Sequence, residues 1–359
     1  MRALNFGLLG CGRVSEKHLT ALTSGLFPGR LVAVADIKPK AAEAKAAKYK
    51  VSAHASLEAM LQAHQEIEVV TVAIPTGHHT EFTIAALNAG KHVVVEKPMA
   101  LRVAECEAMI KAAEKARRRL FVVKQNRLNP AVLAARQALE ADRFGKLVMG
   151  TVRLRWCREQ KYYDDGWHGT WALDGGVMSQ QASHHLDLLQ SFFGPVDFVQ
   201  CQTARRLMDL EAEDTAAALI RFKSGALGIF EATTATRPED LEASLSILGE
   251  KGSVIIGGRA VNRILYWKFT KPRPEDETII QRFSQDVDHV YGLGHGPYYA
   301  NVCEAILQNK PGLVEGAEGK KNIDILSALY ESAACGGEAK KPGCKTVKSK
   351  LGLKKTKGA

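Results

Sequence analysis

The sequence predicts two domains of different architecture, a doubly wound α/β domain followed by an α+β domain. The first 124 residues alternate short apolar runs, rich in β-branched residues, with segments of helical period. Uninterrupted apolar strands of this kind are typical of a parallel sheet with helices on both faces. After Pro130 the runs are longer, and several alternate apolar and polar residues, which favours an open, largely antiparallel sheet. A length of 359 residues also favours two domains.

The first domain, residues 1–124, is expected to contain five strands and four helices. The apolar runs predict strands at residues 4–10, 31–36, 68–74, 92–96 and 120–124. The helical periods predict helices at residues 14–24, 39–49, 80–88 and 103–117. Gly90 follows the third helix and is a stop signal. This alternation of strand and helix predicts a doubly wound parallel sheet.

The second domain, residues 125–339, is expected to begin with a helix at residues 131–141. Strand-like runs follow at residues 147–157, 196–207, 214–222, 226–236, 241–249 and 252–258. Turn signals such as Lys223-Ser224-Gly225 separate them. The stretch 271–296 is poor in apolar residues and is expected to be a functional loop, because long structureless loops are uncommon in compact domains. Helices at residues 297–308 and 318–335 are expected to close the domain.

Composition narrows the class of protein. Hydrophobic residues make up 46% of the chain and charged residues 25%, as in ordinary globular proteins. No apolar run approaches the roughly 18 residues of a membrane-spanning helix, so no membrane partner is expected. The seven cysteines show no CxxC or Cys/His ligand spacing and no complete disulfide framework. This pattern favours a reducing cytoplasm.

The net charge of +10 is concentrated at the C-terminus. Residues 340–359 hold eight lysines and no acid, and subtracting these eight charges leaves +2 for the rest of the chain. A tail of this composition is expected to be disordered and solubilising. The alternative is a tether for nucleic acid or an anionic membrane. We expect no nucleic-acid partner, since the body of the protein is nearly neutral.

A glycine-rich turn follows the first predicted strand. Gly10 permits the tight turn, and Gly12 lets the backbone approach a pyrophosphate held at the helix N-terminus, next to Arg13 and Val14. Asp36 ends the second strand, 24 residues after Gly12, where a carboxylate would bind the adenosine ribose hydroxyls. Together these residues predict a Rossmann dinucleotide site. An acid at this position repels a 2′-phosphate, so the expected cofactor is NAD.

Two polar segments lie at the carboxyl ends of neighbouring predicted strands, where ligands bind in open parallel sheets. The first contains Pro75, Thr76 and His78, and the second contains Glu96 and Lys97. These residues are expected to converge near the nicotinamide.

Four motifs together resemble the glucose-fructose oxidoreductase, inositol dehydrogenase and MocA (Gfo/Idh/MocA) family: GCGRVS, EKPMA, FVVKQNR and WALDGGVMSQQASHHLDLL. The resemblance extends to about residue 340. Further stretches, among them YYDDGWHGTWALDGG and VYGLGHGPYY, resemble the WlbA-type UDP-N-acetyl-glucosaminuronic acid 3-dehydrogenases. The resemblance implies oxidation of the sugar C3 hydroxyl by NAD in acetamido-uronic acid (surface polysaccharide) biosynthesis. It also implies a homo-oligomer, a tetramer or a dimer.

The resemblance assigns catalytic roles to Lys97 of the EKP motif and to His184 of an H-x-x-D pattern that includes Asp187. His78 and Gln125 match positions beside the nicotinamide. The remaining residues expected to contact the substrate are Asn126, Arg127, Tyr163, Trp167, Gln180, Asp187, His295 and Tyr299, with Trp171 and Tyr298 as further contributors.

These residue types suit the chemistry. Hydride leaves a sugar carbon as its hydroxyl loses a proton, so a base must lie within hydrogen-bond reach. A neutral His184 is such a base near neutral pH, and Lys97 would stabilise the developing alkoxide. Many family members have Asp where Gln180 stands, so Lys97 remains a competing base. Among the arginines, Arg127, Arg153, Arg155 or Arg158 would bind a carboxylate or pyrophosphate.

Three alternatives stay open on the sequence alone. A metal site at His184, His185 and Asp187 is disfavoured because no third ligand cluster supports it, and we expect no metal. The same fold could act on another sugar, inositol or a dihydrodiol. It could also serve as a non-catalytic NAD-binding regulator.

Overall fold

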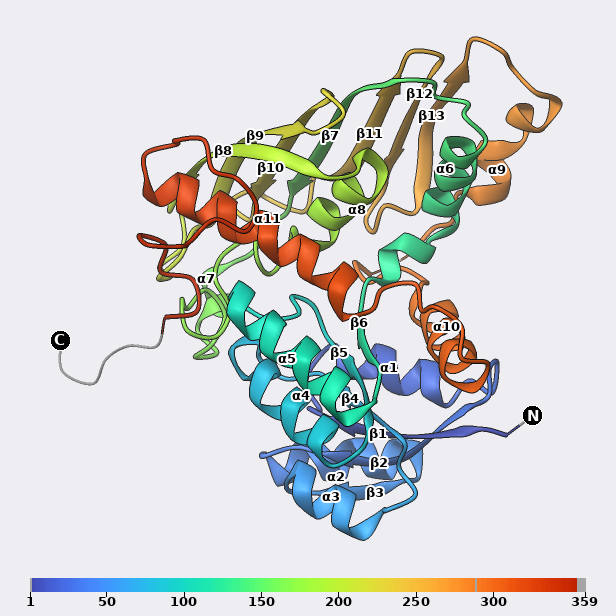
Figure 1. Cartoon of the computed structure of the whole chain (residues 1–359), viewed down its shortest axis with the longest axis vertical. Coiled ribbons are helices and arrows are strands. Elements are labelled where there is room, and N and C mark those ends of the chain that lie inside the picture. Colours follow the sequence, from blue (N-terminus) through green and yellow to red (C-terminus); the bar gives the residue numbers. More distant parts are fainter. Residues whose placement is uncertain (1, 288, 354–359) are drawn as a thin grey trace. The chain divides into compact units, whose positions relative to one another are not determined.

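The computed structural model describes residues 2–287 and 289–353 and divides into two compact units (Figure 1). The chain leaves the first unit after Lys124 and returns to it for His295–Lys321. The second unit contains Gln125–Gly294 and residues 322–353. Residues 295–321 were expected to belong to a continuous second domain, residues 125–339. In the structure the helix of this segment packs in the core of the first unit.

The first unit is built on a six-stranded parallel sheet with the order β3-β2-β1-β4-β5-β6. Its strands are β1 (Leu4–Leu9), β2 (Gly29–Ala35), β3 (Ser52–His54), β4 (Val69–Val72), β5 (His92–Val95) and β6 (Leu120–Val122). Every residue of β4 is buried, as is every residue of β5 after its first. Such burial requires helices on both faces, so the predicted doubly wound class is confirmed. The sequence analysis missed β3.

The helices of this unit pack in pairs. They are α1 (Ser15–Leu22), α2 (Pro39–Tyr49), α3 (Leu57–Ala63), α4 (His79–Asn88), α5 (Val103–Ala116) and α10 (His295–Leu307), with a 3-10 turn, η1 (Thr76–His78). Helix α4 packs beside α5, and α1 packs beside α10 (Figure 1). Helix α11 (Gly316–Ala334) begins in this unit and continues into the second.

The second unit contains a seven-stranded sheet with the order β13-β12-β11-β7-β10-β9-β8. The strands are β7 (Leu147–Arg155), β8 (Val196–Ala204), β9 (Thr215–Phe222), β10 (Leu227–Thr233), β11 (Glu242–Gly249), β12 (Gly252–Gly257) and β13 (Arg263–Phe269). Neighbours are antiparallel except β7 and β10, which are parallel. The open, largely antiparallel sheet is therefore confirmed.

Helices cover one face of this sheet and leave the other open (Figure 1). The helical segments are η2 (Gln125–Leu128), α6 (Pro130–Glu140), α7 (Gln160–Tyr163), α8 (Ser183–Phe193), η3 (Pro274–Glu277), α9 (Ile279–Phe283) and the end of α11. The expected loop at residues 271–296 thus contains η3, α9 and the start of α10. Within the described residues, no helix has the length and apolar character needed to cross a membrane.

The lysine-rich tail is ordered as far as residue 353, which corrects the expectation of a disordered segment. Lys340 pairs with Val199 of β8 through two backbone hydrogen bonds of 2.8 and 2.9 Å. Leu351 is buried, with only 5% of its surface exposed. The lysine content of the tail does not reveal this order, because the contacts are made by backbone groups and by one leucine side chain. Residues 354–359 of the expected tail lie outside the described residues.

A buried carboxyl group joins α11 to the segment that precedes α8. Glu213 is 3% exposed. Its Oε1 accepts hydrogen bonds from the Tyr330 hydroxyl (2.8 Å) and from the Met178 N–H (3.0 Å). Burial raises the pKa of Glu213 to about 7, because the cost of a buried charge outweighs these two hydrogen bonds.

Replacement of Glu213 by Gln should change the pH dependence of stability. The folded protein holds the Glu213 proton up to about pH 7, whereas the unfolded chain releases it near pH 4.5. The wild-type free energy of unfolding therefore falls with rising pH across this window. The Glu213→Gln variant cannot ionise here, so between about pH 5 and pH 8 it should gain roughly 2 to 3 kcal/mol relative to wild type. Urea unfolding at the two pH values measures this gain.

The matched control is Glu239→Gln, because Glu239 is exposed. Its free energy of unfolding should track the wild type at both pH values. A Glu213→Gln variant that also tracks the wild type would contradict the raised pKa.

Candidate active site

The glycine turn between β1 and α1 approaches the end of β4 closely. Gly10 has a φ of +100°, and a Cβ added there would lie 2.2 Å from the Ala73 carbonyl oxygen. A Cβ at Gly12 would meet nothing within 4 Å, so the space beside this residue is open. Ser15 begins α1, and its hydroxyl donates to the Gly12 carbonyl oxygen (2.6 Å). The turn thus leaves room for a phosphate at the start of a helix.

Asp36 lies directly after β2, beside this turn. Its Oδ2 accepts a hydrogen bond from the Cys11 N–H (2.7 Å), and its Oδ1 accepts one from the Lys38 N–H (2.7 Å). A carboxylate has about four acceptor positions, so acceptor capacity remains for ribose hydroxyls. In the same turn Arg13 is exposed and Val14 is half-buried. These residues fit the adenosine side of a dinucleotide.

The polar ends of β4 and β5 lie side by side. Val72 and Val95 are paired across the two strands. Beyond them, the buried His79 ring bridges the two segments, with Nε2 2.9 Å from the Ile74 oxygen and Nδ1 2.9 Å from the Pro98 oxygen. The expected residues Pro75, Thr76, His78, Glu96 and Lys97 all belong to these two segments. The structure therefore brings them to one edge of the sheet.

Glu96 is a buried anion held by specific donors. His18 Nε2 donates to its Oε1 (3.0 Å), and the Lys97 N–H donates to its Oε2 (2.9 Å). Burial opposes ionisation of this carboxyl, but the His18 hydrogen bond and the charges of Lys97 and His295 outweigh it and lower the pKa of Glu96 to about 2. The backbone at Lys97 is consequently tied to a fixed carboxylate.

His295 and Tyr299 lie in the interior of the first unit rather than in a sugar-binding loop. Tyr299 is fully buried, and its hydroxyl lies 2.9 Å from His18 Nδ1 and 3.0 Å from Thr71 Oγ1. The His295 ring packs edge-on against His18 at 5.2 Å. Both residues are on α10, whose buried face closes the core. The structure thus places both residues beside His18, and their expected contact with the substrate stays a prediction.

His18, Glu96 and His295 each offer one ligand atom within 4.8 Å of the others, a spacing that a metal ion could bridge. In the structure a hydrogen bond already joins His18 and Glu96. His18 is also hydrogen-bonded to Tyr299, so both ring nitrogens of His18 have protein partners.

In the second unit, His184 lies in the first turn of α8. The Gln125 amide donates to His184 Nε2 (3.3 Å) and approaches the Tyr291 oxygen (3.4 Å). The tautomer in which Nε2 accepts this hydrogen bond is a neutral imidazole, and the neutral form is the one that a general base requires. The neighbouring His185 is fully buried, and burial lowers its pKa to about 4.

Two buried oxygens on η2 lack hydrogen-bond partners among the described residues. Gln125 Oε1 and Asn126 Oδ1 are buried and accept no hydrogen bond from the described residues. An unpaired buried acceptor is costly unless something else pairs with it. These two side chains therefore suit contact with donor groups such as a carboxamide or sugar hydroxyls.

Arg127 and Asp187 pair with each other. Arg127 Nε and Nη2 donate to the two carboxylate oxygens of Asp187 at 2.7 and 2.9 Å. Asp187 lies one helical turn after His184 and is 1% exposed. The pair holds η2 against α8. Gln180 is largely buried in the segment before α8, and its N–H donates to the Gly176 oxygen (2.9 Å).

The aromatic residues expected at the sugar differ in exposure. The Tyr163 hydroxyl lies 2.7 Å from Thr234 Oγ1, and burial raises the pKa of Tyr163 to about 12. Trp167 is half-buried, and its ring lies 3.6 Å from that of His168. Trp171 is also half-buried in the same segment. The two tryptophans are better placed than Tyr163 to meet a ligand.

The three arginines of β7 and its extension are occupied by acidic side chains. Arg155 binds both Glu231 oxygens (2.5 and 2.9 Å) and also contacts Glu242 (3.1 Å). Arg153 lies within 4 Å of the same two acids. Arg158 pairs with Asp240 (3.0 Å). Each of these three arginines thus has an acidic neighbour in the structure, and their expected contact with a carboxylate or pyrophosphate of the substrate stays a prediction.

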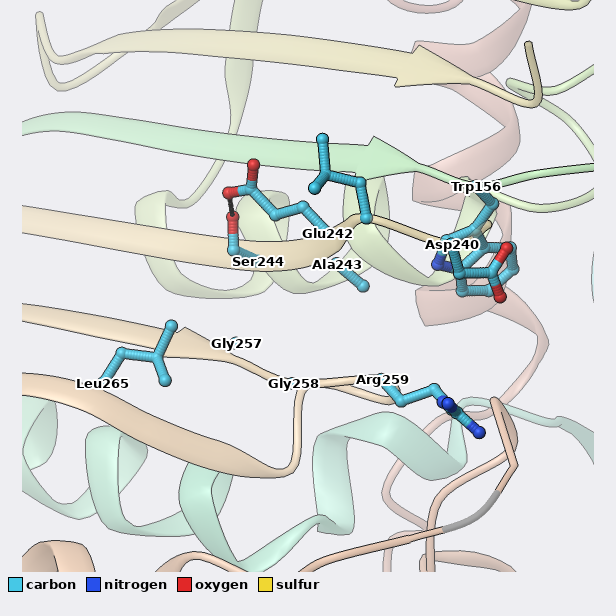
Figure 2. A pocket seen from close by; sticks show the side chains of 10 residues that line it. Trp156, Asp240, Glu242, Ala243, Ser244, Gly257, Gly258, Arg259 and Leu265 are labelled. Carbon is cyan, nitrogen blue, oxygen red and sulfur yellow. Dashed lines mark hydrogen bonds between the residues drawn. The ribbon is translucent and has the colours of Figure 1, made fainter. Parts of the chain in front are cut away.

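A pocket of about 260 Å³ lies at the ends of β11 and β12 (Figure 2). Its lining includes Trp156, Asp240, Glu242, Arg259 and Leu265. None of the lining residues was among the expected site residues.

Sequence reasoning also missed His18. The residue lies in α1, three positions after Ser15, among the buried residues Leu19 and Leu22. A histidine on the buried face of the helix that follows a glycine turn was the available signal, because such a ring needs polar partners.

The glycine turn, the carboxylate after β2 and the polar strand ends define a dinucleotide-binding oxidoreductase. The chain belongs to the Gfo/Idh/MocA oxidoreductase family: the NAD-binding Rossmann-fold domain of that family matches residues 4–124, and its C-terminal alpha/beta domain matches residues 136–340. The expected family and the expected cofactor, NAD, are therefore confirmed.

Two solved structures resemble nearly the whole chain. The WlbA dehydrogenase from Bordetella pertussis, in complex with NADH and UDP-GlcNAcA, is 40% identical with a TM-score of 0.90 and covers 96% of this chain and 99% of that one. The corresponding enzyme from Chromobacterium violaceum, with the same ligands, is 40% identical with a TM-score of 0.88 over 96% and 98%.

Other relatives match over shorter stretches. Inositol 2-dehydrogenase from Rhizobium meliloti is 35% identical over 152 residues, 42% of this chain and 45% of that enzyme. A 1-carboxy-3-chloro-3,4-dihydroxycyclohexadiene dehydrogenase from Comamonas testosteroni is 29% identical over 62% of this chain and 56% of that enzyme. The chain thus spans about half the length of these two relatives.

Replacement of His18 by Leu should destabilise the protein. Glu96 would lose its buried donor, and a hydrogen bond to a charged group contributes about 2 to 3 kcal/mol. Urea unfolding at neutral pH measures this loss. Adding Glu96→Leu to His18→Leu should restore part of it, because no unpaired buried charge then remains.

The matched control is His64→Leu. His64 and Glu66 also form a His-Glu pair (3.3 Å), but their side chains are 20% and 50% exposed. This variant should lose less than about 1 kcal/mol. If both variants lost the same free energy of unfolding, the buried pair would stabilise the protein no more than the exposed pair does, which would contradict the prediction.

Proposed function

We propose that the protein is an NAD-dependent dehydrogenase that oxidises the C3 hydroxyl of UDP-N-acetyl-glucosaminuronic acid, a step in acetamido-uronic acid biosynthesis for a surface polysaccharide. The observation that carries this proposal is the 40% identity over 96% of the chain to a WlbA dehydrogenase bound to NADH and UDP-GlcNAcA. A reducing cytoplasm suits the protein, since none of its seven cysteines, all within the described residues, is in a disulfide.

The proposed reaction removes a hydride from the sugar carbon and a proton from its hydroxyl. NAD supplies the hydride acceptor. Neutral His184 takes the hydroxyl proton, and Lys97 stabilises the developing negative charge on the oxygen. Because a glutamine stands at position 180, no carboxylate there raises the basicity of His184. Lys97 is the competing base.

The cofactor and the substrate each draw on residues already described. For NAD we propose Gly10, Gly12, Arg13, Val14, Asp36, Pro75, Thr76, His78, Glu96, Lys97 and Gln125. For the nucleotide sugar we propose Asn126, Trp167 and Gln180 as direct contacts. We assign Arg127, Asp187 and Tyr163 a supporting role. Arg127 and Asp187 bind each other, and the Tyr163 hydroxyl binds Thr234.

A second candidate is a dehydrogenase of inositol or another free polyol. The 35% identity to inositol 2-dehydrogenase over 152 residues favours it. A single-turnover assay with both kinds of substrate separates the candidates.

The assay is a single turnover. Concentrated protein with NAD and UDP-N-acetyl-glucosaminuronic acid should form reduced nicotinamide in stoichiometric amounts, followed by absorbance even if the product stays bound. UDP-glucuronic acid and inositol are run in parallel. Reduction with inositol alone would favour the second candidate. Binding of NAD without reduction by any of the three would favour a regulator.

Lys97→Ala and His184→Ala should each lower turnover by at least about 100-fold, the range expected for loss of an acid-base or charge-stabilising group. Their affinity for NAD, measured by calorimetry, should change little. Lys111→Ala is the matched control, since Lys111 is exposed on α5. Full turnover in both site variants would refute the assigned roles.

We also propose a homo-oligomer formed through the open face of the second sheet. Leu219 on β9 and Leu227 and Ile229 on β10 are between 37% and 41% exposed. Leu219 and Ile229 are paired across the strands. Nearby, the Arg155, Glu231 and Glu242 side chains supply both signs of charge. Such a mixed surface is complementary to a second copy of itself.

Leu227→Asp combined with Ile229→Asp should dissociate this oligomer. Light scattering should give the wild type a mass of two or four times 39.1 kDa and the variant a lower mass. Leu26→Asp, at a residue 83% exposed in the first unit, should leave the mass unchanged. A monomeric wild type would contradict the proposal.

A further inference from the structure

The C-terminal strap, defined as residues 347–353, is bound at several points to the second unit. It approaches α11 and the segment Trp167–Ala182 that leads into α8. Its contacts come from backbone N–H groups and from one buried side chain. Lysine side chains supply none of the hydrogen bonds described below; Lys348 contributes its backbone N–H.

Glu331 of α11 anchors the start of the strap. Its carboxylate accepts hydrogen bonds from the N–H groups of Val347 (3.0 Å), Lys348 (3.1 Å) and Ser349 (2.9 Å). Glu331 is 3% exposed. Burial opposes its ionisation, but the three N–H donors outweigh this effect and lower the pKa of Glu331. Three charge-assisted hydrogen bonds hold this part of the chain to the helix.

Leu351 and Gly352 attach the strap to the segment before α8. The Leu351 side chain is 5% exposed, and its Cδ1 lies 2.7 Å from where a Cβ of Gly175 would be. Gly175 has a φ of +80°, so both its conformation and this contact favour glycine. The Gly352 N–H donates to the Trp171 oxygen (2.8 Å).

The same segment is held from the other side by α11 and Glu213. The Gly176 N–H donates to the Tyr330 hydroxyl (3.0 Å), and the Trp171 ring packs edge-on against Tyr330 at 5.8 Å. The Met178 N–H donates to Glu213 (3.0 Å). Four residues after Met178, Ala182 occupies the N-cap position of α8. The conformation between Trp171 and α8 is therefore specified by contacts that include the strap.

We propose that the strap is a positioning element for the substrate side of the site. Through Leu351 and Gly352 it fixes the segment that carries Trp167 and Gln180 and that sets the start of the helix bearing His184. Leu351 and Glu331 are positioning residues, since neither touches substrate. This inference rests on the proposed function, because it assigns this segment to the nucleotide sugar.

The test is Leu351→Ala in the full chain, assayed with NAD and UDP-N-acetyl-glucosaminuronic acid. The cavity left beside Gly175 should loosen the segment, raising the KM for the sugar about tenfold or more and lowering kcat less. The Kd for NAD should stay within about twofold, because the residues proposed to hold NAD lie almost entirely in the first unit. Leu351→Met should restore the KM, since it refills the space.

Val347→Ala is the matched control: its side chain is 81% exposed, and the backbone N–H survives. Leu351→Val replaces the alanine variant if the latter folds poorly. Unchanged KM and kcat in a folded Leu351 variant of reduced stability would overturn the proposal, because the strap would then be only structural.

Hydrogen exchange separates failure of this inference from failure of the proposed function. If wild-type protein reduces no NAD with the UDP-sugar, faster amide exchange at residues 171–178 in Leu351→Ala still supports the strap as the element that orders this segment. Exchange equal to wild type there overturns it, whatever the substrate.

Discussion

The hydrogen bond between His18 and Glu96 is the interaction on which the nucleotide-binding unit depends. It joins α1, which follows the glycine turn, to the end of β5, where the EKP motif begins. The other carboxylate oxygen of Glu96 holds the Lys97 N–H. A buried carboxylate is tolerated only when donors surround it. The His18–Glu96 pair therefore stabilises the core and also fixes the position of the Lys97 backbone N–H. A change in this pair should alter both the stability of the unit and the geometry of the site.

Much of the first unit could be predicted because its rules are local. Apolar runs reveal buried strands, and glycines followed by an acid after the second strand mark a nucleotide turn. The strand β3 was missed because it has three residues and little burial. The place of His295 and Tyr299 in the first core could not be predicted, because nothing local shows that a helix about 170 residues beyond Lys124 returns to it.

The second unit shows why charge is hard to interpret from sequence. Arg155 was a candidate anion binder, yet its partner Glu231 lies 76 residues away on a neighbouring strand. The lysine-rich tail was expected to be disordered, yet Glu331 binds its backbone N–H groups. Composition carries no signal for a contact that any non-proline residue can make. The expected positions of His184 and Gln125 were more accessible to sequence reasoning, because both lie within long family motifs.

The return of the chain to the first unit affects how the protein can be made and divided. Tyr299 fills the space beside Phe6 and Phe27 and contacts the hydroxyl of Thr71. A nascent chain that has left the ribosome only as far as Lys124 therefore has all six strands but lacks the side chain that closes them. The nucleotide-binding unit can finish folding only after most of the polypeptide has been synthesised. A fragment cut at the apparent domain boundary would carry an open apolar gap and a partly unsatisfied His18.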